Sequence, residues 1–160
     1  MARLLGSNRA KSDRIIFMKT QVLFWLLAAI DGHAKNFSYF LLPGGRYHLT
    51  PSYDVMSAYP LISNHSLEKQ KIKMAMAMAV EGKNCHYKWN TIRCRHWYET
   101  AKQCRFDKDE LKLIIDELCE PMEEHIDKVA EQIPTDFPEA LSNSIFKGML
   151  SARNTLIKSC

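Results

Sequence analysis

The sequence predicts a single α+β domain over residues 1–160 that is mostly helical and carries a small β-hairpin region. An unbroken apolar stretch, residues 22–30, is typical of a buried helix. Two short apolar runs flank a Pro-Gly-Gly turn, which is typical of a hairpin, and four segments with helix-start signals fill the second half of the chain. A content of 46% hydrophobic and 25% charged residues is that of one folded domain with a sizeable core.

The first predicted helix covers residues 13–29, "DRIIFMKTQVLFWLLAA". Asp13 is expected to cap it, because a carboxylate at the start of a helix accepts hydrogen bonds from the first free N–H groups. The side chains that fall on one stripe at helical spacing are Ile16, Thr20, Leu23 and Leu27. The last turns are apolar on every side, which predicts a helix in the centre of the domain.

A hairpin is predicted next, from "FSYFLL" and "RYHLTP" on either side of Pro43, Gly44 and Gly45. Glycine supplies the positive φ that a tight turn needs. A further strand is predicted over residues 72–78, "IKMAMAM", where Met alternates with Lys or Ala. Its three methionines are expected to pack within the sheet, and a groove for a partner is the alternative.

Four helices follow, each identified by the residues at its start. Asn90 is expected to cap the first, and Asp107 with Glu110 forms a capping box for the second. Pro121 and Pro138 open the third and the fourth, where a missing N–H costs nothing. The predicted ranges are 91–104, 108–119, 122–133 and 139–157.

The charge of the chain is mild but segregated. A net charge of +4 permits an acidic or nucleic-acid partner without requiring one. Residues 107–139 hold 12 of the 18 acidic side chains against three lysines, whereas residues 83–105 hold six Lys or Arg against one acid. Trp89, Trp97 and Tyr98 in this basic segment favour helix packing, with stacking on nucleic-acid bases as the alternative.

The cysteines and the start of the chain predict a cytoplasmic protein with free thiols. The five cysteines are an odd number, and the opening "ARLLGSNRAKSDR" lacks the apolar core of a secretory leader. The longest uncharged apolar stretch, residues 20–30, is too short to span a membrane, so no membrane partner is expected. Zinc is the weaker reading of Cys85, Cys94, Cys104 and the nearby histidines, because their spacing fits no common finger.

Polar residues follow the buried helix abruptly. They are Asp31, Gly32, His33, Lys35 and Asn36, in the stretch "IDGHAKNFS". A plain surface turn explains the Asp-Gly pair equally well. Asp54, however, follows the predicted hairpin, which returns the chain towards Asp31 and Asn36. Two carboxylates and one carboxamide converging on one spot predict a Mg²⁺ site that also holds phosphate oxygens.

The spacing of these three residues, Asp-x₄-Asn, a hairpin and then Asp, is also that of protein kinases. In kinases the first Asp of Asp-x₄-Asn accepts the proton of the substrate hydroxyl, while the Asn and a later Asp hold the metal. Asp31, Asn36 and Asp54 match that order. Lys35 is placed to neutralise charge that develops on a transferring phosphoryl group.

The amino-acid sequences of these segments resemble those of one protein family. "DGHAKNFS" followed by "GGRYHLTPSYDVMSAYP" closely resembles the HipA family of bacterial toxin kinases, and the likeness extends from "DRIIFMKTQV" to "AKQCRF" and "PTDFPEA". The resemblance implies that the chain is a protein-kinase-like C-terminal lobe, with Asp31 as the proton acceptor and with Asn36 and Asp54 as the Mg²⁺ ligands. The other residues that would line the phosphate side of bound ATP are His33, Ala34, Lys35 and Tyr53.

The resemblance also implies partners. HipA-like enzymes phosphorylate a serine of glutamyl-tRNA synthetase and stall translation. A helix-turn-helix antitoxin, HipB, restrains them, and the pair sits on operator DNA. Lys102 and Arg105 in "AKQCRF" match a basic pair that contacts DNA in that complex. These two residues share a helix face if the helix runs to Phe106.

The kinase N-terminal lobe (N-lobe) is expected to be absent from this chain, since no glycine-rich loop, strand lysine or helix glutamate is visible. Losing that half of the ATP clamp costs many orders of magnitude in rate. The first hypothesis is therefore an enzyme whose N-lobe comes from another chain or reading frame. The second is a non-catalytic lobe that binds antitoxin or operator DNA.

Overall fold

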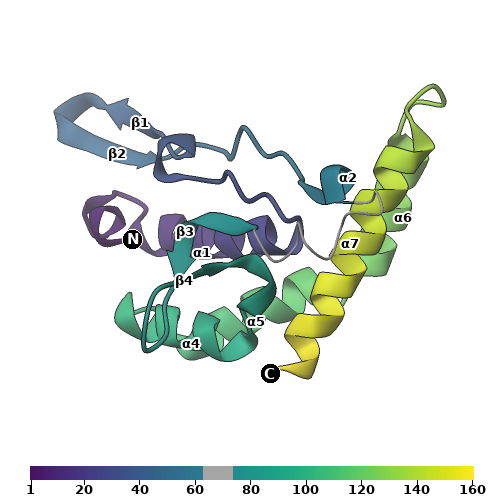
Figure 1. Ribbon diagram of the computed structural model, residues 1–160. Coiled ribbons are helices and arrows are strands. Elements are labelled where there is room, and N and C mark those ends of the chain that lie inside the picture. Colours follow the sequence, from purple (N-terminus) through teal and green to yellow (C-terminus); the bar gives the residue numbers. More distant parts are fainter. Residues whose placement is uncertain (63–73) are drawn as a thin grey trace.

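The computed structural model describes residues 1–62 and 74–160, and it is mostly helical with two small antiparallel sheets (Figure 1). The helices are α1 (Ala10–Leu26), α2 (Tyr59–Ile62), α4 (Cys94–Gln103), α5 (Lys108–Cys119), α6 (Met122–Gln132) and α7 (Glu139–Lys158). The strands are β1 (Tyr39–Leu42), β2 (Arg46–Leu49), β3 (Ala75–Val80) and β4 (His86–Lys88). The 3-10 helices are η1 (Ala2–Gly6), η2 (Ala34–Asn36), η3 (Pro43–Gly45) and η4 (Trp89–Thr91).

Helix α1 is the central element, as its apolar last turns predict. Val22, Phe24, Trp25 and Leu26 are buried on different sides of it, within the main cluster of core residues. In Figure 1 the sheets lie above and in front of α1, with α4 and α5 below it and α6 and α7 beside its C-terminal end. The predicted stripe is wrong at Ile16, which is 45% exposed.

Asp13 does not cap α1, which corrects the prediction. The helix begins at Ala10, and Asp13 lies buried in its first turn. Its carboxylate accepts hydrogen bonds from the Ser7 hydroxyl and from the Leu49 N–H, the latter at 3.0 Å. The helix starts three residues before Asp13, so that this carboxylate lies inside the helix, where it is buried and ties the end of β2 to α1.

The β1–β2 hairpin forms as predicted. The strands are antiparallel, and Tyr39 pairs with Leu49. Gly44 and Gly45 have φ values of 76° and 72°, which is the left-handed conformation that glycine adopts without strain. Seen in Figure 1, the hairpin projects from the body, and its returning strand leads along the top of α1 towards α2.

The second sheet is separate from this hairpin. Strand β3 begins at Ala75 and pairs with β4, which the sequence did not predict. Residues 72 and 73 of the predicted strand lie outside the described residues. Met74 and Met76 are buried, in agreement with packing inside the fold, while Met78 is only partly covered.

The four helices of the second half are present, with one wrong start. Asp107 caps α5, because its carboxylate accepts the N–H groups of Asp109 and Glu110; these bonds hold the pKa of Asp107 below its usual range. Pro121 and Pro138 directly precede α6 and α7. Asn90 is not a cap, since it lies in η4 and α4 begins four residues later, at Cys94.

A disulfide contradicts the expectation that all five thiols are free. Cys94, at the start of α4, is bonded to Cys160, which lies two residues after the end of α7. The two residues are 66 positions apart, and only the tertiary fold brings them together. Cys85, Cys104 and Cys119 are free. Within residues 1–62 and 74–160, no helix combines the length and the apolarity needed to cross a bilayer.

Candidate functional site

The loop that carries Asp31 leaves α1 through a sharp turn at Ala28. Ala28 has a φ of 49°, and the N–H of Ala29 reaches back to the carbonyl of Phe24. The carbonyl of Ala28 then accepts two N–H groups, from Ile30 at 2.9 Å and from Ala58 at 3.0 Å. The end of α1 is therefore the anchor for both segments of the site, residues 30–38 and residues 53–58.

Gly32 allows this loop to lie directly on the core. A Cβ atom at Gly32 would come within 2.2 Å of the ring of Phe24, which is fully buried. Any other residue would therefore force the ring or the loop to move. The contact explains why a glycine stands between Asp31 and His33. This reason could not be predicted from the sequence.

Gly32→Ala is expected to lower the free energy of unfolding by about 1–3 kcal/mol, because it overpacks a rigid aromatic contact. Urea denaturation followed by tryptophan fluorescence measures the change. Combining it with Phe24→Leu should make the two losses less than additive, since the smaller side chain makes room for the methyl group. Strict additivity would show that Gly32 and Phe24 are not coupled.

Asn36 and Asp54 meet at the centre of the site. The Asn36 side chain is buried at the end of η2, where its Oδ1 accepts the His33 N–H at 3.0 Å. Its Nδ2 donates to Oδ2 of Asp54 at 2.5 Å. These residues are 18 positions apart in the chain, so the hairpin returns Asp54 to the polar loop as expected.

The backbone around Asp54 is unusual and well anchored. Asp54 has a φ of 56°, a left-handed conformation that is uncommon for a residue with a side chain and that often marks a functional position. Behind it, the Ser57 hydroxyl donates to the carbonyl of Leu27 at 2.6 Å, and the buried Tyr59 hydroxyl donates to the carbonyl of Leu26 at 2.9 Å. Burial raises the pKa of Tyr59, which keeps its hydroxyl a neutral donor.

Tyr53 joins the two segments a second time. Its hydroxyl donates to the carbonyl of Lys35 at 2.9 Å and lies 2.7 Å from the Ser38 hydroxyl. These contacts hold the backbone of the polar loop against the residue that precedes Asp54.

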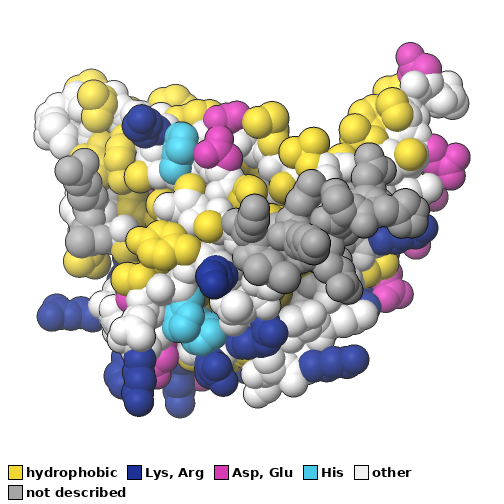
Figure 2. Space-filling model, viewed as in Figure 1, with side chains coloured by type: hydrophobic (Ala, Val, Ile, Leu, Met, Phe, Trp, Pro, Cys, Tyr) yellow, Lys and Arg dark blue, Asp and Glu magenta, His cyan; other side chains and the backbone are white. Residues whose placement is uncertain are grey.

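The remaining predicted site residues lie on the loop that leads to Asn36. Asp31, Ala34 and Lys35 are exposed, whereas His33 is half-buried. The Nδ1 atom of His33 is buried and has no hydrogen-bond partner among the described residues. Figure 2 shows acidic side chains beside a histidine and a basic side chain at the upper edge of the face in view. The loop therefore carries a carboxylate, an imidazole and an ammonium group within five consecutive residues.

The donor set of Asn36 and Asp54 fits Mg²⁺. Their polar groups converge, and the exposed carboxylate of Asp54 leaves room for phosphate oxygens and water. Holding the cation would require the amide of Asn36 to present its oxygen in place of its nitrogen. Among the described residues, no three His, Cys, Asp or Glu side chains are grouped so that they could hold a metal ion by themselves. A cation held by Asn36 and Asp54 would therefore need phosphate oxygens or water as further ligands.

Two of the residues that were considered as zinc ligands, Cys94 and His96, have structural roles. Cys94 is in the disulfide, and His96 stacks on His86 with ring centroids 3.9 Å apart. Burial, together with the neighbouring His86, Arg95 and Arg93, lowers the pKa of His96. The pair therefore packs the β3–β4 hairpin on α4.

Lys102 and Arg105 are both exposed but do not share a helix face, which corrects the geometric expectation. Helix α4 ends at Gln103, and Arg105 has a φ of 51° in the turn that follows. Arg14 of α1 donates to the carbonyls of Cys104 and Arg105 at 2.8 and 2.6 Å and so fixes this turn. The two basic side chains therefore start from differently oriented backbone.

Comparison with known proteins shows which family and which solved structure this chain resembles. The family model "HipA-like C-terminal domain" matches residues 1–126. The fold is similar to a solved structure of the Shewanella oneidensis MR-1 toxin–antitoxin system HipA, HipB and its operator DNA, with a TM-score of 0.79 and 16% sequence identity. The match covers 97% of this chain and 34% of the solved chain, so this chain spans about a third of the length of that relative.

Proposed function

This chain belongs to the family of HipA-like C-terminal domains, and on that premise we propose that it is the lobe that carries the catalytic loop of a HipA-like serine/threonine protein kinase. The contact between Asn36 and Asp54 is the observation that carries the proposal. It brings together two chain segments in the order and spacing that kinases use for their metal ligands.

In the proposed reaction, the carboxylate of Asp31 accepts the proton of a serine hydroxyl. The hydroxyl oxygen then forms a bond to the γ-phosphorus of ATP, and the bond from that phosphorus to the bridging oxygen breaks, so that ADP leaves. Asn36 and Asp54 would hold Mg²⁺, which when bound neutralises charge on the phosphate oxygens. The ammonium of Lys35 would neutralise charge on the γ-phosphoryl group.

His33 and Tyr53 have supporting roles in this proposal. The half-buried imidazole of His33 would line the phosphate side of the site. Tyr53 acts through the backbone, since its hydroxyl is already bonded to the carbonyl of Lys35. Ala34 leaves the approach to the loop open, because it is exposed and small.

Phosphoryl transfer depends on a second lobe to clamp ATP. The proposed enzyme is therefore a two-lobe assembly, and its protein substrate would be similar to glutamyl-tRNA synthetase. By itself this lobe is expected to transfer no phosphate. The second candidate function, a non-catalytic lobe that binds a HipB-like antitoxin on operator DNA, rests on the exposed Lys102 and Arg105 and on the HipB and DNA of the solved relative.

Lys102→Ala is expected to weaken DNA binding by the antitoxin-bound protein and to reduce the slope of log affinity against log salt by about 1, since one phosphate contact is lost. Fluorescence anisotropy with labelled operator DNA at several salt concentrations measures this slope. Lys128→Ala is the control, because Lys128 pairs with Glu124 on the acidic α6. An unchanged slope in Lys102→Ala would remove this residue from the DNA interface.

The kinase proposal is tested with labelled ATP, Mg²⁺ and glutamyl-tRNA synthetase. The purified chain is incubated with and without the N-lobe of a HipA-like kinase. We expect labelling of the substrate only when both lobes are present, and none with Asp31→Ala. Labelling that persists in Asp31→Ala would contradict the assigned base, and no labelling in any mixture would favour the non-catalytic lobe.

A further inference from the structure

The residues that follow α7 are joined to the start of α4 by two bonds. Cys160 forms the disulfide with Cys94, the first residue of α4, and the two Cα atoms are 5.1 Å apart. The Cys94 N–H also donates to the hydroxyl oxygen of Ser159 at 3.0 Å, which satisfies one of the free N–H groups at this helix start. Ser159 in turn donates to the carbonyl of Leu156 in α7 at 2.9 Å. The disulfide therefore keeps the end of α7 in the position where it caps α4.

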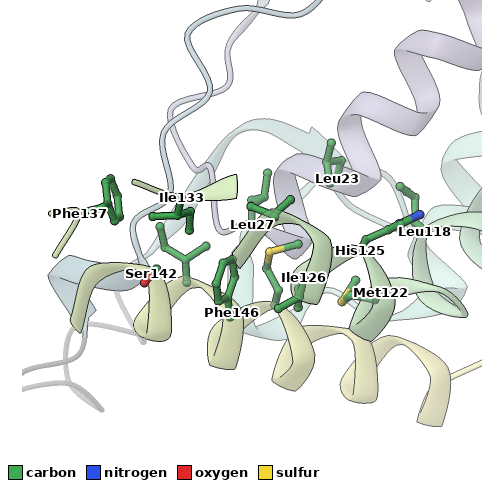
Figure 3. A pocket seen from close by; sticks show the side chains of 13 residues that line it. Leu23, Leu27, Leu118, Met122, His125, Ile126, Ile133, Phe137, Ser142 and Phe146 are labelled. Atoms are coloured by element: carbon green, nitrogen blue, oxygen red, sulfur yellow. The ribbon is translucent and has the colours of Figure 1, made fainter. Parts of the chain in front are cut away.

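Packing holds α7 on the domain only in part. Of its twenty residues, Ser142, Ala152 and Leu156 are buried. An apolar groove of about 410 Å³ lies between α7 and the helices beside it, and Figure 3 shows Phe146 of α7 and Leu27 of α1 in its lining. Side chains that face such a space lack contact partners on one side. The disulfide therefore adds stabilisation that the packing of α7 does not supply.

Helix α7 also supports the segment of residues 53–58. A Cβ atom at Gly148 would come within 2.4 Å of the Tyr59 ring, so the α7 backbone lies directly against this ring. Tyr59 follows Ala58, whose N–H donates to the carbonyl of Ala28 at 3.0 Å. Loosening of α7 is therefore expected to reach the hydrogen bond that anchors this segment on the end of α1.

The two cysteines of the disulfide differ in exposure. Cys160 is exposed, whereas Cys94 is 1% exposed. A thiolate in solution can therefore attack the Cys160 sulfur, with the Cys94 sulfur as the leaving group. Arg93 and Arg95 flank Cys94 in the sequence, and positive charge at the start of a helix favours a departing thiolate. Exposed disulfides are the more readily reduced kind, which fits a regulatory bond.

We propose that the Cys94–Cys160 bond is a reversible thiol switch, which fixes the end of α7 to α4 when oxidised and loosens α7 when reduced. The reductant is a small thiol such as glutathione. This inference goes beyond phosphoryl transfer and does not depend on it.

Reduction of this bond takes two steps. In the first, a glutathione thiolate bonds to the Cys160 sulfur, and the electron pair of the broken bond goes to the Cys94 sulfur, which takes up a proton. In the second, another glutathione thiolate attacks the glutathione sulfur of this mixed disulfide, and the Cys160 sulfur leaves and takes up a proton. Two electrons and two protons pass to the protein, and one molecule of oxidised glutathione forms.

The chemistry is tested by equilibrating the full chain in mixtures of reduced and oxidised glutathione. Free thiols are then alkylated and counted by mass spectrometry. We expect two thiols to be lost reversibly as the share of oxidised glutathione rises, and peptide mapping should assign them to Cys94 and Cys160. A bond that never forms, or that persists in reduced glutathione alone, would overturn the proposal.

The effect on the fold is measured on the same samples. Reduction is expected to lower the Tm by about 5–15 °C, because the bond closes a loop of 66 positions in the unfolded chain. Hydrogen exchange should become at least about tenfold faster at the amides of Cys94 and Ala58, which report the cap of α4 and the anchor of residues 53–58. Equal exchange of both amides in the two states would overturn the switch.

Two variants separate the bond from other effects of the reductant. Cys160→Ser is expected to fold, because Cys160 is exposed, and to show the Tm and the exchange rates of the reduced protein in every mixture. Cys85→Ser is the matched control, since Cys85 is an exposed free thiol, and it should keep the full response. A Cys160→Ser protein that behaves like the oxidised chain, or a Cys85→Ser protein that no longer responds, would refute the assignment.

Discussion

Asp31→Asn is expected to slow phosphorylation by the two-lobe assembly by a factor of about 10²–10⁴, the usual contribution of a general base. Asparagine keeps the size of the side chain but cannot accept the proton of the substrate hydroxyl. Because Asp31 is exposed in a turn, the substitution should leave the stability of the fold unchanged. The rate is measured with labelled ATP, and the stability by thermal unfolding.

The matched control is Asp109→Asn, an exposed carboxylate in the first turn of α5. It is expected to retain the full rate. The pH profile gives an independent check, since the acidic limb that reports the base should disappear with Asp31. A rate within a factor of three of the original protein would show that Asp31 is not the base.

Asp13→Ala is expected to lower the free energy of unfolding by about 3 kcal/mol. The change leaves the Leu49 N–H without its acceptor, which costs about 1–3 kcal/mol, and it also removes one bond of the Ser7 hydroxyl, which keeps the Tyr47 carbonyl as an acceptor at 3.1 Å. Urea denaturation measures the loss. Hydrogen exchange should also show faster exchange of the Leu49 amide, because the hairpin is released from α1.

Ser7→Ala serves as the comparison, since it removes one donor and leaves the Leu49 N–H bonded to Asp13. It should cost less than Asp13→Ala. Ser12→Ala, whose exposed hydroxyl bonds only the Arg9 carbonyl, is the neutral control. A loss below about 1 kcal/mol in Asp13→Ala would mean that this buried carboxylate does not hold the hairpin in place.

Local chemistry explains which parts of the fold the sequence predicts well. The cap at Asp107, the prolines before α6 and α7, and the Pro-Gly-Gly turn all act within a few residues, so their effect is visible in the sequence. The start of α1 and the role of Asp13 were predicted wrongly, because the burial of that carboxylate depends on a strand 36 positions away. Strand β4 and the Cys94–Cys160 bond likewise depend on the packing of distant segments.

Some features of the site could also be predicted from the sequence, and others could not. The return of Asp54 to Asn36 could be expected, because a hairpin lies between them. The anchoring of both segments on the last carbonyls of α1, through Ser57, Ala58 and Tyr59, could not, since those bonds connect residues about 30 positions apart.

The most direct test of the central claim, that Asn36 and Asp54 form a divalent-cation site beside Asp31, is Mn²⁺ titration of the ¹⁵N-labelled chain by NMR. Mn²⁺ takes the same oxygen ligands as Mg²⁺ and broadens nearby amide signals. We predict broadening confined to residues 31–38 and 53–56, and its loss in Asp54→Asn. Broadening centred on the acidic residues 107–139, or undiminished in Asp54→Asn, would contradict the account.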